Sequence, residues 1–252
     1  MKIHFIHHSS FLVELEHHVL LFDYFDGARV KEYDFGGMLP EMDEKKDIYV
    51  FASHKHRDHF DMDNLKLANK YPKVQFVFSK DCRMSPNFLR KHGYGEEIEQ
   101  RIIYVAPNKV YQIGEVAVYT ILSTDAGVAF CVEVEGKWFY HAGDLHWWHW
   151  EQDTEAENIR REKVYKREIK KLSEYAFDVA FVPLDSRQGT QAFKGFDYFV
   201  KNVKANRIIP MHMWRDYSLI ERYVEKCKEK SLEEKIVRIY RENQEIEVKE
   251  KY

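Results

Sequence analysis

The chain has 252 residues, of which 44% are apolar and 15% aromatic, so the composition excludes a disordered protein and allows a large buried core. Its 39 basic and 42 acidic residues give a formal net charge of −3. This balance gives no reason to expect a nucleic-acid or anionic-membrane partner and favours a small-molecule substrate. The length is compatible with a single layered α/β domain over residues 1–252.

The cysteines and the N-terminal segment bear on the cellular compartment. Cys82, Cys131 and Cys227 form no CxxC pair, so neither a disulfide framework nor a thiolate zinc site is expected. The segment MKIHFIHHSSFLVELEHHVLLF lacks the unbroken apolar stretch of a signal peptide, and no segment reaches transmembrane length. We therefore expect a soluble cytoplasmic protein.

The first hundred residues are predicted to combine strands with short helices. Two apolar runs, FLVEL and VLLFD, indicate paired strands at a sheet edge, the second closed by Asp23. The run DIYVFAS, residues 47–53, predicts a buried strand that leads directly into SHKHRDHFD, so these histidines are expected on a loop after a strand. A short helix over 63–69, a strand at VQFVFS and a helix over 85–93 should follow.

The remainder of the chain passes from successive strands to alternating helices and strands. Five runs, IIYV, KVYQI, VAVYTIL, VAFCVEV and KWFY, predict an antiparallel part. The charged stretch 155–175 predicts a surface helix, because Tyr165, Ile169, Leu172 and Ala176 fall at helical spacing. DVAFVPLDS and RIIPMH predict strands, 196–203 and 219–227 predict helices, and IVRIY with EIEV predicts a closing hairpin.

The strongest chemical motif is HxHxDH at the end of the strand DIYVFAS, formed by His54, His56, Asp58 and His59. Neutral imidazole and carboxylate are the ligands that zinc and neighbouring metals prefer. The alternative is a solvated histidine-rich turn. Two further pieces favour metal binding, because Asp144, in the GD pair after KWFYHA, and His212, at the end of RIIPMH, also stand where a strand meets a loop.

This order of motifs resembles the metallo-β-lactamase superfamily over nearly the whole chain. The resemblance is closest to the branch of L-ascorbate 6-phosphate lactonases and the phospholipase D that cleaves N-acyl-phosphatidylethanolamines. That branch often opens with a GHSSF-like segment, and this chain has HHSSF at residues 7–11. The resemblance implies a four-layer αβ/βα sandwich, in which two mixed sheets pack face to face with helices outside and the metals at one edge.

The resemblance also implies two divalent metal ions, with Zn²⁺ favoured and Mn²⁺ or Fe²⁺ as alternatives. It assigns His54 and His56 to the first metal and Asp58, His59 and His212 to the second. Asp144 would bridge the two ions. Asp58 would also act in catalysis, by orienting a metal-bridging hydroxide or passing a proton to the leaving group.

The sequence departs from the family pattern at the third ligand of the first metal. A histidine normally precedes the GD aspartate by about a hairpin's length, whereas the segment STDAGVAF offers Asp125. We expect Asp125 to bind this metal directly or to act one water away. The alternative is an ordinary turn residue close to a glycine.

Four further residues are expected to contact substrate. They are His8, Trp147, Asp185 and Arg187. Each also has a structural alternative, because strand-end histidines and tryptophan clusters often serve packing, and Asp185 and Arg187 could form a loop salt bridge.

These observations predict a metal-dependent hydrolase that attacks an ester, lactone or phosphoester bond of a small molecule through a metal-bridging hydroxide. One alternative is a phosphodiesterase acting on lipid or nucleotide substrates. Others are a di-iron redox protein and a non-catalytic metal-binding protein. Iron members of this fold typically carry a glutamate where this chain has His56, which weighs against the di-iron alternative. The sequence does not indicate an oligomeric state.

Overall fold

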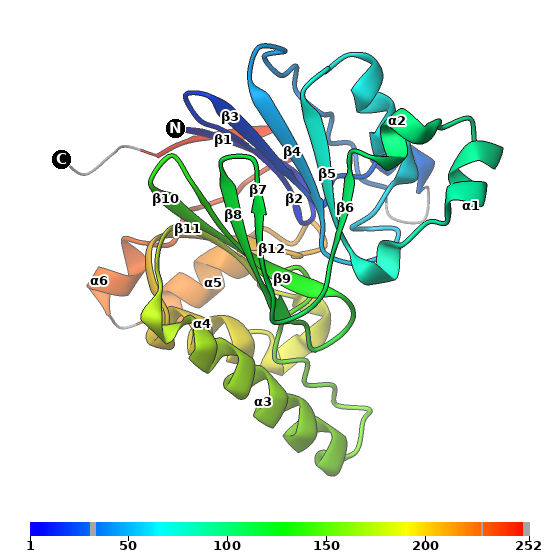
Figure 1. Cartoon of the computed structure of the whole chain (residues 1–252). Helices are drawn as coiled ribbons and strands as arrows, with labels where there is room; N and C mark the ends of the chain where they lie inside the picture. Colours follow the sequence, from blue (N-terminus) through cyan, green and yellow to red (C-terminus); the bar gives the residue numbers. More distant parts are fainter. Residues whose placement is uncertain (31–33, 228, 249–252) are drawn as a thin grey trace. The chain divides into compact units, whose positions relative to one another are not determined.

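The computed structural model describes residues 1–30, 34–227 and 229–248. These residues form two compact units. The first contains Met1–Ala106 and the segment that begins at Glu242, and the second contains Pro107–Arg241. Each unit is built around its own mixed β-sheet (Figure 1). The fold is therefore α/β with two sheets and helices, whereas the expectation of a single domain stays a prediction.

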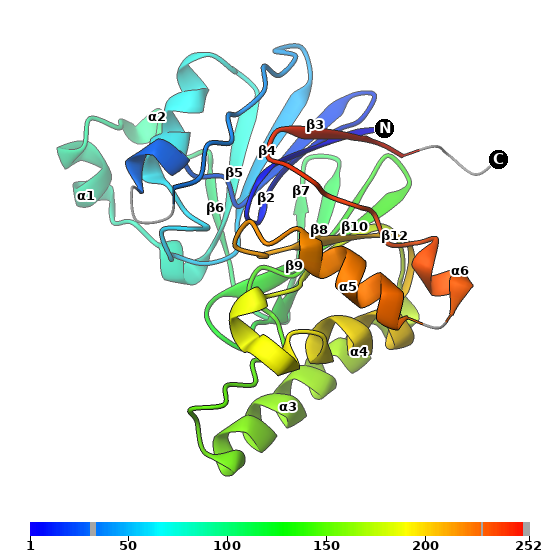
Figure 2. The same cartoon turned by 180° about the vertical axis from the view of Figure 1, so that it is seen from behind.

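In the first unit, the described residues form a sheet of seven strands in the order β13-β1-β2-β3-β4-β5-β6. The strands β1, β2 and β3 pair antiparallel, and β3 through β6 pair in parallel. Short helices follow β5 and lie on the side of β5 and β6 in both views (Figure 1 and Figure 2). The elements are β1 (Lys2–His7), β2 (Ser10–Glu14), β3 (His18–Phe22), η1 (Gly27–Arg29), β4 (Asp47–Ala52), η2 (Met62–Asn69), β5 (Val74–Ser79), η3 (Lys80–Cys82), α1 (Pro86–Lys91), α2 (Glu96–Glu99), β6 (Ile102–Val105) and β13 (Gln244–Glu247).

In the second unit, the described residues form a sheet of six strands in the order β12-β11-β10-β9-β8-β7. The strands β7 through β10 form an antiparallel meander, and β10, β11 and β12 run parallel. Both views show α3, α4 and α5 along one face of this sheet. The elements are β7 (Val110–Ile113), β8 (Val116–Leu122), β9 (Val128–Val134), β10 (Lys137–His141), α3 (Glu155–Lys170), η4 (Lys171–Glu174), β11 (Ala176–Pro183), η5 (Ser186–Gln191), α4 (Lys194–Asn202), β12 (Lys204–Met211), α5 (Ser218–Lys226) and α6 (Lys230–Glu233).

The composition of the strands explains their places in the sheets. The central strands β3 and β4 read HVLLF and DIYVFA and are almost entirely buried, as expected of parallel strands covered on both faces. The rings of Phe22 and Phe51 stack across this pair with centroids 4.8 Å apart. The edge strand β7 reads VYQI and is largely accessible to solvent. The buried parallel strands thus form rigid supports for the loops that follow them.

Helix ends also follow the local sequence. The helix α3 begins with a capping box, in which the Thr154 side chain accepts from the backbone of Glu157 and the Glu157 carboxylate accepts from the backbone of Thr154. The predicted helix after Ser85 is confirmed as α1, with the Ser85 hydroxyl accepting from Phe88 N. The segment predicted as a helix over 63–69 forms the 3₁₀ helix η2, capped by Asp61. No helix in the described part of the chain is long and apolar enough to cross a membrane.

Three predictions of local structure are wrong. EIEV contributes to β13, which pairs with β1 at the edge of the first sheet and not with IVRIY, where Ile236 makes only an isolated bridge to Ile208. IIYV forms β6, which pairs in parallel with β5 and leaves the antiparallel meander to begin at β7. The predicted helix over 155–175 is confirmed as α3 followed directly by η4, which ends at Glu174, so only the placement of Ala176 on its apolar face is wrong. Ala176 begins β11, because a helical spacing of apolar residues can continue by chance into a strand.

Candidate metal centre

In the first unit, the HxHxDH motif occupies the loop after β4, as the sequence predicts. His54 and His59 are fully buried, Asp58 is 8% exposed and His56 is exposed. The loop closes on itself through His59 N and Phe60 N, which both donate to His56 O. The rigid end of β4 and this tight turn together hold the four side chains of the motif.

A buried carboxylate that the sequence analysis did not assign to the site anchors this loop. Asp23 follows β3, has a positive φ of 44°, and is 0% exposed. Its carboxylate accepts hydrogen bonds from Ser53 N at 2.7 Å, Ser53 Oγ at 2.6 Å and His59 Nδ1 at 2.7 Å. Because a carboxylate only accepts, Nδ1 of His59 carries the proton and Nε2 keeps its lone pair. Asp23 thus fixes both the orientation and the tautomer of His59.

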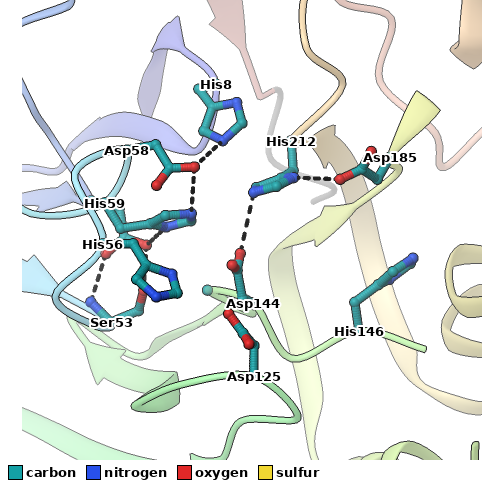
Figure 3. Close-up of polar contacts among 12 residues, drawn as sticks. His8, Ser53, His56, Asp58, His59, Asp125, Asp144, His146, Asp185 and His212 are labelled. Carbon is teal, nitrogen blue, oxygen red and sulfur yellow. Dashed lines mark hydrogen bonds and ion pairs between the residues drawn. The ribbon is translucent and has the colours of Figure 1, made fainter. Parts of the chain in front are cut away.

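Two sets of potential ligand atoms emerge from the first unit. His54 Nε2 lies 3.0 Å from His56 Nδ1, and the other nitrogen of His54 contacts Ser53 Oγ at 2.9 Å. Asp58 Oδ2 lies 3.3 Å from His8 Nε2 and 3.8 Å from His59 Nε2 (Figure 3). Two nitrogens bound to one tetrahedral zinc at 2.0–2.1 Å lie about 3.3 Å apart. The donor spacing in this unit therefore fits shared metal ligation.

The two histidines of HHSSF have different roles: His7 packs in the interior, and His8 lies beside the candidate metal ligands. His7 is buried, donates from Nε2 to Phe25 O at 3.0 Å, and burial lowers its pKa to about 4. His8 has a φ of 46° in the turn between β1 and β2 and faces Asp58. The expected contact of His8 with substrate stays a prediction, but its ring belongs to the same group of side chains as Asp58 and His59.

In the second unit, Asp144 and His212 lie together at the ends of their strands. Asp144 Oδ1 is 3.4 Å from His212 Nε2, and His212 Nδ1 is 2.9 Å from Asp185 Oδ2 (Figure 3). His212 has a φ of 64° directly after β12, so the backbone leaves the extended strand conformation at this residue. Asp185 is 0% exposed and fixes the tautomer of His212 as Asp23 does for His59.

Asp185 is held in the charged form by its neighbours. Arg187 donates to it through Nε at 3.0 Å and 3.1 Å and through Nη2 at 2.6 Å. Burial alone would raise the pKa of the Asp185 carboxyl, but the hydrogen bonds from His212 and Arg187 outweigh burial and hold this pKa well below its usual range. The predicted pair of Asp185 and Arg187 thus forms a salt bridge that supports His212, while direct substrate contact stays a prediction.

Asp125 lies next to Asp144 in the same unit. It occupies the turn between β8 and β9, where its backbone N donates to Ser123 Oγ at 3.2 Å. The neighbouring Thr124 Oγ1 donates to His146 O at 2.7 Å and accepts from His146 N at 2.9 Å, which ties the turn to the loop after β10. A carboxylate oxygen of Asp125 therefore lies within 4.8 Å of one of Asp144. This proximity is compatible with a shared metal.

The tryptophans of LHWWHW diverge in direction. The ring of Trp147 lies 4.5 Å from the Lys166 ammonium and 6.2 Å from the Tyr198 ring, so its contacts are with α3 and α4. The Trp148 ring instead lies 5.8 Å from the His212 ring and stacks on Trp150. The contact between Trp147 and substrate stays a prediction, and Trp148 is the tryptophan of this run that packs against His212.

His146 is a further buried histidine that the sequence analysis did not single out. Its Nε2 lies 2.8 Å from Gln188 Oε1, and burial lowers its pKa to about 4. A Cβ at Gly195 would lie 2.4 Å from the His146 ring, so α4 can approach this loop only because residue 195 lacks a side chain. His146 is a neutral packing residue that joins the loop after Asp144 to η5 and α4.

The sequence does contain a feature that points to Asp23, namely its position at the end of a buried strand. An acid that ends one buried strand lies beside the loop of the next parallel strand, which here is the loop with HxHxDH. For His146, by contrast, no spacing motif separates it from the other histidines of LHWWHW.

Comparison with known proteins places these observations in a family context. A family model described as "beta-lactamase superfamily domain" matches residues 2–161. A structure named "possible metal-dependent hydrolase" from Veillonella parvula DSM 2008 is 14% identical with a TM-score of 0.54, and the match covers 98% of each chain. Zn²⁺-bound PqqB from Methylobacterium extorquens is 12% identical with a TM-score of 0.52, covering 98% of this chain and 100% of that one.

A third solved structure has different reported chemistry. A mutant of the CmlA β-hydroxylase is 12% identical with a TM-score of 0.59, covering 98% of this chain and 54% of that one. CmlA is described as a diiron β-hydroxylase from Streptomyces venezuelae. At these identities the three structures share the fold with this chain, and their metals and reactions are their own.

Proposed function

Because the chain belongs to the metallo-β-lactamase superfamily, we propose that it is a metal-dependent hydrolase of an ester, lactone or phosphoester bond in a small molecule. The observation that carries the proposal is the pair of carboxylate-bound histidines, one in each unit. His59 and His212 each donate a hydrogen bond from Nδ1 to a buried carboxylate. The Nε2 atom of each histidine lies near an aspartate of the predicted ligand set. This arrangement is typical of histidines that bind metals.

The donor atoms fit divalent ions. In the first unit, His54 with His56, and Asp58 with His59, offer nitrogen and oxygen atoms at separations of 3.0 Å and 3.8 Å. In the second unit, Asp144, Asp125 and His212 offer two carboxylates and one imidazole. We propose that each of these two sets of residues binds divalent metal.

Asp58, Asp23 and Asp185 would have different roles in hydrolysis. When bound, two divalent ions lower the pKa of water and polarise the substrate oxygen that becomes negative. Asp58 is 8% exposed and lies next to His59, so its carboxylate can orient the attacking group or accept its proton. Asp23 and Asp185 hold His59 and His212 in one tautomer, which keeps the ligand geometry fixed during turnover.

The metal identity is part of the proposal. Asp125 in place of a histidine would raise the share of carboxylates among the metal ligands, and harder oxygen ligands shift preference from zinc toward manganese or iron. Zinc remains the favoured ion, because four of the seven proposed ligand residues are histidines. A di-iron redox protein is the second candidate that this carboxylate content favours.

The test combines metal analysis with a substrate panel. Purified protein should contain close to two equivalents of a divalent metal, and should turn over at least one of a panel of esters, lactones and phosphodiesters. Turnover should disappear with chelator and return with the metal. His17→Ala, at a side chain 73% exposed, is the matched control for loss of a histidine. Metal content without any hydrolysis, together with visible absorbance of an iron centre, would contradict the hydrolase and support the redox candidate.

A further inference from the structure

A cavity of about 310 Å³ lies in the second unit, apart from the predicted metal ligands. Its walls come from the end of η5, one face of α4 and the last turn of α5, which lie side by side in both views (Figure 1 and Figure 2). This volume is at the lower end of the range of small-molecule sites. None of the residues that the structure describes on its walls is a predicted metal ligand.

The cavity wall is positively charged. Lys194 and Lys201 are seven residues apart on α4, so they share a face and are separated by about 10 Å along the helix axis. Lys226 contributes a third ammonium from the last turn of α5. Three lysines against the single Asp197 give the wall a formal charge of +2. A second hollow of about 580 Å³ shares Asp197, Lys201, Lys226 and Cys227 with this cavity and is also lined by Glu229.

The one aspartate of the inner cavity is already engaged. Asp197 accepts from Lys201 Nζ at 2.8 Å and from Tyr223 OH at 3.2 Å. Its charge is therefore compensated by Lys201. Among the described residues, neither Lys194 nor Lys226 forms an ion pair with a carboxylate. The charge available to a ligand is that of these two lysines.

Aromatic rings complete the cavity. The Lys226 ammonium lies 5.3 Å from the centre of the Phe193 ring, and the rings of Phe193 and Tyr223 meet edge to face with centroids 5.4 Å apart. Lys194 Nζ lies 3.3 Å from His149 Nδ1 and 5.7 Å from the Trp147 ring, two groups that are not on the cavity wall and that leave the lysine without a carboxylate partner. Two ammonium groups with aromatic walls match a ligand that combines negative groups with a planar part.

We propose that this cavity binds a small aromatic dianion, with phosphate or carboxylate groups at Lys194 and Lys226 and its planar part against Phe193 and Tyr223. This site is separate from the proposed metal centre. It would therefore give the protein a second binding function that does not depend on hydrolysis.

Cys227 provides a local readout, because it lines the cavity and is partly exposed while Cys82 and Cys131 are buried. The thiol reagent 5,5′-dithiobis(2-nitrobenzoate) is itself an aromatic dianion, and 4,4′-dithiodipyridine is an uncharged reagent of similar shape. The ratio of their rate constants cancels any change in the reactivity of the thiol itself. Mass spectrometry would verify that only Cys227 is modified.

The lysine variants test the charge. Lys194→Gln and Lys226→Gln should each lower the ratio of anionic to neutral rate constants by about threefold or more at low salt. Lys170→Gln, on the exposed last turn of α3, is the matched control and should leave the ratio unchanged. An equal ratio in the parent and in both cavity variants would overturn the proposal.

Protection experiments identify the anionic group. Phenyl phosphate and phthalate at millimolar concentration should slow the reaction of Cys227 with the neutral reagent in the parent and not in Lys226→Gln. Protection by one of the two would assign the site to phosphate or to carboxylate ligands. If neither protects, or if uncharged benzyl alcohol protects equally well, the cavity does not select aromatic anions.

Discussion

Replacing Asp23 by asparagine should weaken both the stability of the first unit and its metal binding. The carboxylate is 0% exposed and accepts three hydrogen bonds, from Ser53 N, Ser53 Oγ and His59 Nδ1, at distances between 2.6 Å and 2.7 Å. Asparagine has nearly the same shape but replaces one acceptor oxygen with an NH₂ group. At least one of the three donors therefore faces another donor.

The expected magnitude follows from these contacts. A hydrogen bond to a charged group contributes about 1.5–3 kcal/mol, and a buried donor left unsatisfied costs about 1–3 kcal/mol. We expect Asp23→Asn to lower the free energy of unfolding by about 2–4 kcal/mol, since Ser53 can reorient its hydroxyl and recover part of the loss. His59 also loses the acceptor that fixes its tautomer, so metal affinity should fall about 10–100-fold.

Urea unfolding of the metal-free protein and metal titration against a competing chelator measure the two effects separately. Asp26→Asn is the matched control, because Asp26 accepts from Ala28 N at 3.1 Å and asparagine caps as well as aspartate does. The control should change neither quantity. Parent-like stability together with parent-like metal affinity in Asp23→Asn would refute the assignment of Asp23 as the residue that orients His59.

Four further substitutions test the remaining arguments. His56→Ala and Asp144→Asn should each abolish most of the hydrolysis while the fold is retained. Asp144→Asn should lose more metal than His56→Ala, because a bridging carboxylate serves both ions. Full activity of purified Asp144→Asn, with its metal content measured, would contradict the assigned site. Asp125→His should shift metal content toward zinc and alter the pH profile of turnover, whereas an unchanged metal content and profile would make Asp125 a turn residue. Burial lowers the pKa of His7 and of His146 to about 4 in the folded protein. As the pH falls, these histidines therefore take up protons at a higher pH in the unfolded chain than in the folded protein. The free energy of unfolding should then fall as pH drops from about 6.5 to about 4, by up to about 3 kcal/mol for each histidine, and His7→Gln should reduce this dependence in urea unfolding at several pH values.

The sequence predicted the placement of the HxHxDH loop because two independent signals agreed there. An apolar run of strand length ends at Ala52, and the metal-ligand pattern begins at His54. The same agreement holds for His212 after β12 and for Asp144 after β10. In each case the local pattern and the strand end are close in sequence, so no knowledge of tertiary pairing was needed.

Features that depend on tertiary pairing could not be predicted in the same way. The C-terminal run EIEV has the alternation of a strand, but its choice of β1 as partner depends on contacts more than two hundred residues away. Similarly, Trp147 and Trp148 are adjacent and identical in type, yet one packs against Lys166 and the other against His212. Adjacent side chains in a loop are directed by the surrounding helices, and the sequence alone does not show which helix is near.

The two units reach the same histidine geometry by the same topological route. In the first, β3 and β4 are parallel neighbours with Phe22 opposite Phe51, and the residue after β3 is Asp23. In the second, β11 and β12 are parallel neighbours with Pro183 opposite Met211, and Asp185 follows β11 as His212 follows β12.

Parallel neighbours end at the same edge of a sheet, so an acid after one strand can meet a histidine from the loop after the next. The acid is buried against the strand ends and accepts from Nδ1, which leaves Nε2 to point outward from the sheet edge. Two buried parallel strands, an acid closing the first and a histidine soon after the second thus form a pattern that can be searched for in a sequence. In the structure this arrangement joins Asp23 to His59 and Asp185 to His212, which are the carboxylate–histidine pairs on which the proposed metal binding rests.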